Sequence, residues 1–181
     1  MRLNVFTTAL LVLLTLVSCN SEPSLQKYFV QNTDNKDFIA LDISPSILNI
    51  EKTKLTAEQT EALKSFDKMN ILAFKANATN QAQFETERTK VKTILKDPKY
   101  QKLMSFGSGK DGASISYVGS DENIEEFVVF ANRKENGFAV VRVLGKNMNP
   151  NNIITLMSVL KESKIDMEQL KPLQQLINTN K

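Results

Sequence analysis

Side chains with reactive chemistry are scarce in this sequence of 181 residues, which contains one cysteine and no histidine. The absence of histidine excludes Ser-His and Cys-His catalytic pairs, and it removes the commonest general base near neutral pH. An enzyme built from this chain would need a Ser-Lys pair, such as Ser108 with Lys110, or a pair of carboxylates. Glu125 and Glu126 cannot form such a pair, because neighbours on a predicted strand point to opposite faces. We therefore predict no catalytic residue, no metal ligand and no cofactor site.

Two polar loops match ligand-binding motifs only in part. The segment "FGSGKDGAS" places Lys110 behind a glycine, but a phosphate-binding loop would need glycine and Ser or Thr where Met104 and Asp111 stand. The segment "TDNKDF" contains Asp34, Asn35 and Asp37, but it lacks the third ligand, the central glycine and the distal glutamate of a calcium loop. Both segments are predicted to be ordinary polar loops.

Residues 1–18 have the layout of a secretory signal, with one cation at Arg2 followed by an apolar run and small residues. The apolar run is about 12 residues long, which gives a helix of roughly 18 Å. Such a helix is too short to cross a hydrocarbon core of about 30 Å. We therefore predict that this segment is removed and does not span a membrane.

The end of this segment, Leu16-Val17-Ser18-Cys19, resembles the bacterial lipobox. The resemblance implies that the Cys19 sulfur is coupled to diacylglycerol and that Cys19 becomes the first residue of the mature chain. Several acyl chains would attach the protein to a membrane permanently. An acylated sulfur cannot act as a nucleophile, and no second cysteine is present to form a disulfide. The alternative is an ordinary signal peptide that has a cysteine near its end by chance.

These features predict a membrane-anchored lipoprotein of the cell envelope that faces the periplasm. Exposure on the cell surface stays open, as does the choice between inner and outer membrane. The full chain has 23 Lys and Arg against 20 Asp and Glu, and the cations are spread along it. Aromatic residues do not alternate with them as in proteins that bind single-stranded nucleic acid. Because export also argues against such a role, we expect no nucleic-acid partner.

Periodicity and boundary signals predict alternating helices and strands. Thr56 and Gln59 form a capping box for a helix over 57–67, and Asn80 with Gln83 is predicted to cap a longer one that ends at Asp97. Asn149 and Pro150 open a further helix, and a last segment begins at Asp166 and is broken by Pro172. Strands are predicted over 38–44, 69–76, 100–106, 113–118, 124–131 and 138–144.

The predicted fold is α+β, a two-layer sandwich in which helices cover one face of a single antiparallel sheet of about five to six strands. Short connections allow only antiparallel neighbours, and the nearly continuous apolar runs "FVVFA" and "FAVVRVLG" belong in the middle of the sheet. We divide the chain into a lipoprotein signal peptide over 1–18, a lipidated N-terminus and tether over 19–36, and a single domain over 37–181.

Several segments together with the lipobox resemble a known family. They are "FIALDISPSIL", "MNILAF", "DPKYQKLMSF", "IEEFVVFA", "FAVVRVLG" and "GKNMNPNNIITLM". The chain resembles uncharacterised lipoproteins of Bacteroidetes built on a domain of unknown function, the 4252 family, from about Phe38 to Leu160. The resemblance implies the fold and an envelope location, and it points to a sensory or accessory role linked to envelope stress. It brings no activity and no functional residues.

We therefore expect a non-enzymatic binding or accessory module, held at a membrane by acyl chains on Cys19. Its partner is expected to be an envelope protein or another envelope component, bound on the open face or the edge of the sheet. Two alternatives stay open. One is an envelope hydrolase that uses a Ser-Lys pair or paired carboxylates, and the other is a purely structural periplasmic component.

Overall fold

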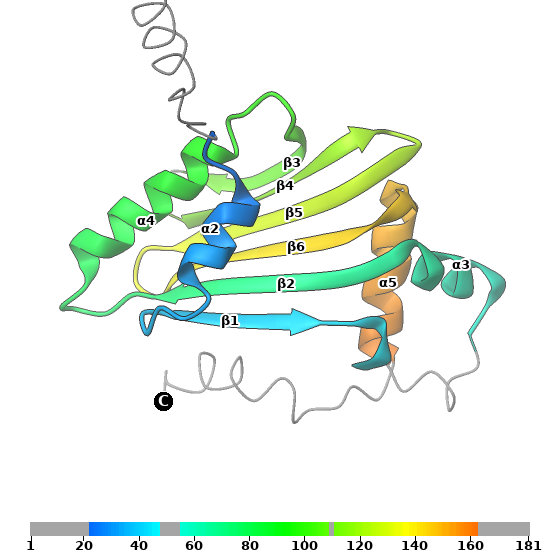
Figure 1. Cartoon of the computed structure of the whole chain (residues 1–181), viewed down its shortest axis with the longest axis horizontal. Coiled ribbons are helices and arrows are strands. Elements are labelled where there is room, and N and C mark those ends of the chain that lie inside the picture. The colour runs from blue at the N-terminus through cyan, green and yellow to red at the C-terminus, as the bar shows by residue number, and fades with distance from the viewer. Residues whose placement is uncertain (1–21, 48–54, 109–110, 163–181) are drawn as a thin grey trace, which may run out of the picture.

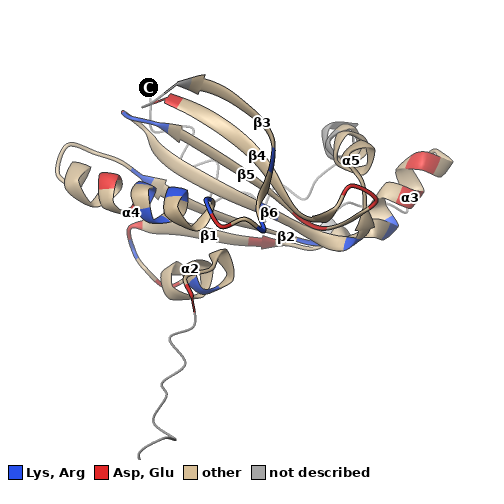
Figure 2. Cartoon of the chain, turned by 90° about the horizontal axis from the view of Figure 1, so that it is seen from above, with Lys and Arg blue, Asp and Glu red and all other residues tan. Residues whose placement is uncertain are grey.

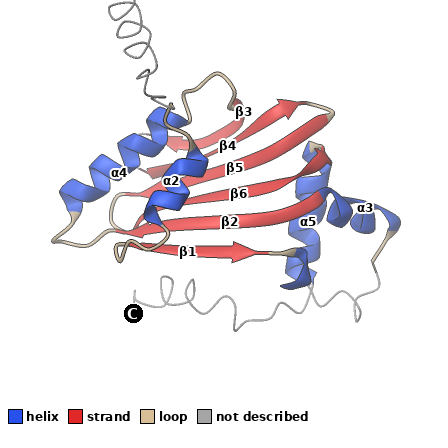
Figure 3. Cartoon of the chain, in the orientation of Figure 1, coloured by secondary structure: helices blue, strands red, loops and turns tan. Residues whose placement is uncertain are grey.

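The computed structural model describes residues 22–47, 55–108 and 111–162 (Figure 1). Its centre is one antiparallel sheet of six strands in the order β1-β2-β6-β5-β4-β3. The strands are β1 (Phe38–Ile43), β2 (Phe66–Lys75), β3 (Gln101–Ser108), β4 (Asp111–Ser120), β5 (Asn123–Arg133) and β6 (Gly137–Met148). The helices are α2 (Leu25–Asn32), α3 (Ala57–Ser65), α4 (Gln81–Ile94) and α5 (Pro150–Glu162), with a 3₁₀ turn, η2 (Pro45–Ile47) (Figure 3). The predicted α+β class is confirmed.

The middle of the sheet is formed by β5 and β6, the two strands with nearly continuous apolar sequence. Their hairpin turns at Gly137, whose φ of 117° lies in the region that favours glycine. A Cβ atom at this position would lie 1.8 Å from the carbonyl oxygen of Phe74 on β2, so the close approach of the two strands also requires glycine. A tight hairpin turn is confirmed at this place, but its loop is residues 134–136, and Gly137 is the first residue of β6, paired with Arg133.

One face of the sheet, termed the α2–α4 face, packs against α2 and α4. Its core is aromatic: the rings of Phe74 and Phe138 stack with centroids 5.7 Å apart, and Phe38 meets Phe74 edge-on at 5.2 Å. Phe84 on α4 completes the cluster and is fully buried. This cluster fixes both helices to the strands.

The opposite face, termed the α3–α5 face, is covered at one end by α3 and α5, as Figure 2 shows from above. The sequence pattern predicted helices on one face, and this arrangement holds for α2 and α4 only. The reason lies in the alternation of strand side chains, which puts Phe127 and Val128 on opposite faces although both are buried. A strand that is apolar on both sides needs cover on both sides.

Helix α2 lies within residues 19–36, where the sequence pattern predicted a tether. Leu25, Tyr28 and Phe29 stand at helical spacing and are all buried against the sheet. Ser24 caps the helix by accepting a hydrogen bond from the Lys27 amide. The folded domain therefore begins at Ser24. The predicted tether over 19–36 was too long, because it ends before Ser24.

The capping box of Thr56 and Gln59 is confirmed at the start of α3. The box predicted for Asn80 and Gln83 is wrong, because the Gln83 side chain donates to Asp37 Oδ2 at 2.9 Å instead. Residues 1–21, including Cys19, and the segment that follows Asp166 lie outside the described residues. Within the described part of the chain, no helix is both long and apolar enough to cross a membrane.

Candidate functional site

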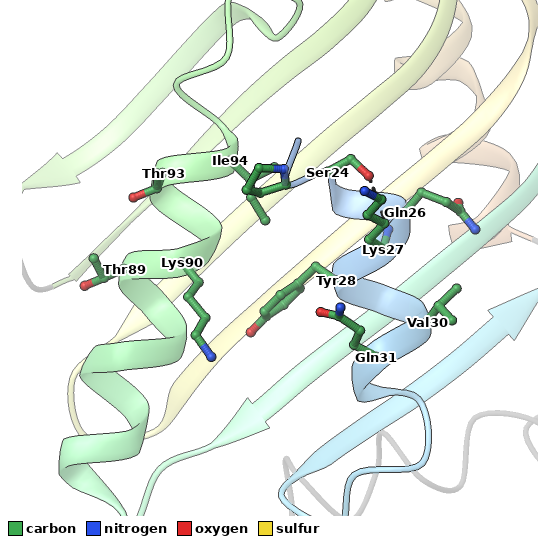
Figure 4. Close-up of a pocket in the computed structure, with 11 residues that line it drawn as sticks. Ser24, Gln26, Lys27, Tyr28, Val30, Gln31, Thr89, Lys90, Thr93 and Ile94 are labelled. Carbon is green, nitrogen blue, oxygen red and sulfur yellow. Dashed lines mark hydrogen bonds between the residues drawn. The ribbon is translucent and has the colours of Figure 1, made fainter. Parts of the chain in front are cut away.

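An open groove of about 840 Å³ lies between α2 and α4, on the outer side of the helix layer (Figure 4). The first wall consists of residues from α2 and the stretch before it, and the second consists of residues from the C-terminal half of α4. The lining residues are Pro23, Ser24, Gln26, Lys27, Tyr28, Val30, Gln31, Thr89, Lys90, Thr93 and Ile94. A hollow on the other side of α4 is smaller, at about 370 Å³.

The shape of the groove follows from the side chains that each helix turns toward it. On α4, Thr89 and Thr93 are one turn apart and line the groove with short side chains, which Figure 4 shows on the flank of α4 away from α2. On α2, Val30 is 66% exposed although it is apolar. The groove thus has an apolar lining with small side chains on one wall, an arrangement that suits an apolar ligand.

Tyr28 and Glu87 join the two walls beneath the groove. The Tyr28 hydroxyl donates to Glu87 Oε2 at 2.8 Å, and Lys90 Nζ donates to Glu87 Oε1 at 2.7 Å. Burial raises the pKa of the Tyr28 phenol well above its usual range, and the bond to Glu87 raises it further. Tyr28 therefore stays protonated and acts as a permanent donor.

A second polar cluster fixes α2 from below. Arg142 on β6 is 5% exposed and donates from Nε to Glu126 Oε1 on β5 at 2.7 Å, and from Nη1 to Gln26 Oε1 on α2 at 2.8 Å. Its guanidinium also lies 5.4 Å from the centre of the Phe29 ring. The cluster is a paired buried charge that holds the position of α2 relative to the sheet.

Comparison with known protein families shows which family the chain belongs to. The model of the domain of unknown function DUF4252 matches residues 28–156. The chain belongs to the DUF4252 family. No curated protein and no solved structure matches it.

The DUF4252 match runs from α2 into α5 and therefore includes all six strands and the second groove wall, but only Tyr28, Val30 and Gln31 of the first wall. Sequence reasoning missed the groove, because it treated the first wall as part of a tether. The spacing of Leu25, Tyr28 and Phe29 was the available signal for a helix there. Nothing local indicated which helix would lie beside it.

Other residues considered in the sequence lie elsewhere in the DUF4252 domain. Glu126 is engaged with Arg142 on the α2–α4 face, whereas Glu125 is exposed and stands at an irregularity of β5, between the registered residues Ile124 and Glu126. Lys110 and Cys19 lie outside the described residues. The Ser108–Lys110 pair considered in the sequence therefore lies partly outside the described residues.

A separate hollow of about 390 Å³ between α3 and the start of α5 contains two carboxylates, Glu58 and Glu61. They stand three residues apart on α3, so both belong to one side of that helix. Its other lining residues are Asn149, Asn151, Asn152, Ile154 and Thr155. Among the described residues, no cluster of three or more Asp, Glu or Cys residues could hold a metal ion.

The α3–α5 face of the DUF4252 domain stays apolar beyond the part that α3 and α5 cover. A row of registered residues crosses all six strands, and its members are Ile39, Ala73, Ala139, Ala131, Ala113 and Phe106. The exposed fraction is 59% at Phe106, which stands on the edge strand β3. The surface that the sequence pattern favoured for binding is therefore apolar and uncharged along this row.

Proposed function

We propose that this DUF4252 protein is a lipid-anchored, non-enzymatic binding module of the cell envelope, with the α2–α4 groove as its binding site. The observation that carries the proposal is the position of the groove in the chain. Its first lining residue, Pro23, is four residues after Cys19, so the connecting chain spans at most about 14 Å. With Cys19 acylated, the groove works at the surface of a bilayer.

The groove suits the apolar part of an amphiphilic envelope component. The ring of Tyr28 and the side chains of Val30 and Ile94 supply apolar contacts. Lys27 and Lys90 reach the rim with aliphatic stems that add to this surface and amines that stay near water. An acyl chain is the ligand class with this chemistry that is most abundant beside a membrane anchor.

The test uses the mature chain without lipid, residues 20–181, and a fluorescent fatty acid as the probe. Thr89→Trp adds a bulky ring to the lining of the groove, and we expect it to weaken binding at least about tenfold, or by roughly 1.4 kcal/mol. Thr86→Trp is the matched control, because Thr86 is also an exposed α4 threonine bonded to the preceding turn but does not line the groove. Equal binding by both variants, or no binding by the wild type, contradicts the proposal.

A periplasm-facing location and a link to envelope-stress regulation complete the proposal. They rest on the lipobox resemblance and on the likeness to Bacteroidetes lipoproteins. A reporter of envelope stress in cells that lack the protein, complemented with wild type or Thr89→Trp, tests whether the groove serves such a role. A purely structural component would be complemented equally by both.

The alternative of an envelope hydrolase is supported by one observation, the two carboxylates in the hollow between α3 and α5. Paired carboxyl groups can divide the roles of acid and base in glycoside hydrolysis. Release of soluble fragments from isolated cell walls, abolished in Glu58→Gln and in Glu61→Gln, would favour this alternative over the binding module.

A further inference from the structure

A cationic hollow of about 370 Å³ lies on the other side of α4, above β3 and β4. It is separate from the α2–α4 groove, and its role is independent of the function proposed for that groove. Its lining residues are Lys92, Leu95, Lys96, Lys102, Ser105, Phe106, Gly107, Gly112, Ala113, Ser114, Ser116, Phe130 and Asn132. Three of them are lysines and none is acidic.

The floor of the hollow consists of hydroxyl groups at positions where the sheet has apolar residues elsewhere. Ser114 and Ser116 on β4 are registered with Phe130 and Val128 on β5, which belong to the core of the α2–α4 face. Ser105 on β3 is registered in turn with Ser114. Alternation places these three serines on the same inward face as that core. Ser116 is 4% exposed, so its hydroxyl is among the buried polar groups of the domain.

The cations approach this floor from two directions. Lys92 lies in the last turn of α4, and Lys96 lies in the turn that follows the helix. Lys102 comes from β3, where it is registered with Ser116. Burial and the nearby Arg88 lower the pKa of Lys92, against the opposing effect of Glu85. An anion placed beside Lys92 would favour its charged form.

The lining of the hollow combines ammonium and hydroxyl groups and contains no acidic residue, so it offers a set of donors for a compact anion. Charge-assisted bonds to phosphate oxygens are short and strong, and lysine binds phosphate as a point charge that can adjust its position. A carboxylate has two oxygens, whereas a phosphate group offers enough acceptors for lysines and serines together. We propose that this hollow binds a phosphate group, either on a phospholipid headgroup or on a soluble phosphorylated compound.

The experiment measures binding of inorganic phosphate and of glycerol phosphate to residues 20–181 by calorimetry, with phosphatidylglycerol vesicles as a parallel arm. We expect Lys96→Gln/Lys102→Gln to weaken binding at least about tenfold, because two charge-assisted contacts are lost. Lys36→Gln/Lys146→Gln removes the same charge outside the hollow and is the control. Ser116→Ala tests the floor and is expected to weaken binding without a change in net charge.

Binding of glycerol phosphate in solution identifies a soluble ligand, and binding of the vesicles alone identifies a headgroup. Either result supports the site if the variants in the hollow lose that binding and the control variant keeps it. The proposal is overturned if the two double variants lose vesicle binding equally, because the attraction is then a general effect of net charge. It is also overturned if the wild type binds neither form of phosphate. Circular dichroism of each variant separates loss of the site from loss of the fold.

Discussion

The phenol of Tyr28 on α2 and the carboxylate of Glu87 on α4 form a 2.8 Å hydrogen bond between residues 59 positions apart in the chain. Both side chains are buried, and Lys90 provides the second contact of the carboxylate. This bond links the two walls of the groove beneath its opening. The position of the groove therefore depends on one polar contact as well as on the aromatic core.

Tyr28→Phe keeps the ring and removes only the hydroxyl that donates to Glu87. We expect a loss of about 1–2 kcal/mol in the free energy of unfolding, because the buried carboxylate loses one of its two partners. Urea denaturation followed by circular dichroism measures it. The double variant Tyr28→Phe/Glu87→Gln should recover part of the loss, since an amide is easier to bury than a charge. A single variant as stable as the wild type would show that the bond does not hold the helices together.

Arg142 and Glu126 are predicted to be strongly coupled. Glu126→Ala leaves the Arg142 charge buried without its carboxylate, and we expect a loss of about 3–5 kcal/mol. Replacing both by apolar residues of similar size, Glu126→Leu/Arg142→Met, is expected to restore most of that stability. A double-mutant cycle in urea measures the coupling. Additive effects of the two single changes would contradict a direct interaction.

The tyrosines predict a loss of stability at high pH. Burial and the negative charge of Glu126 raise the pKa of Tyr100 to about 12, above its usual value near 10. Because the raised pKa belongs to the folded state, its contribution to stability is complete below pH 10 and disappears as the pH rises from 10 to 12. Denaturation midpoints measured between pH 8 and 12 test this dependence. A midpoint that stays constant up to pH 12 would contradict the burial of the phenol.

Membrane attachment depends on Cys19 in our proposal. Cys19→Ala is expected to leave an unprocessed precursor, whereas the wild type stays with the membrane fraction after cell lysis. Protease treatment of intact and lysed cells that express a tagged protein determines the side of the membrane. Protection in intact cells agrees with a periplasm-facing domain, and cleavage in intact cells indicates the cell surface. Processing of the variant like the wild type would mean that Cys19 is not acylated.

Several elements of the fold were predictable because their determinants are local. The capping box of Thr56 and Gln59 needs only residues three apart, and Gly137 marks its turn by a conformation that few other residues adopt. The central place of β5 and β6 followed from their continuous apolar sequence. The family relationship followed from the same segments.

The predictions that failed depend on contacts between residues that are far apart in the chain. Gln83 was predicted to turn back to its own helix, but Asp37, 46 residues away in the chain, offers a better partner. Polar and apolar residues are mixed at the start of α2, so only the sheet on which Leu25 packs shows that the segment belongs to the domain. Helices were predicted on one face because a strand pattern does not say which helix covers which side.

By itself, the sequence determined the order of the elements from β1 onward, the fold class, the scarcity of reactive side chains and the candidate anchor at Cys19. Only the tertiary structure decided what lies side by side: Arg142 with Gln26, Tyr28 with Glu87, and Lys92 of α4 beside the serines of β4 in one hollow. The physical reason is the range of the interactions. Caps, turns and periodicity act over a few residues, whereas a groove or a hollow is the space left when distant segments pack, and its lining depends on the whole core.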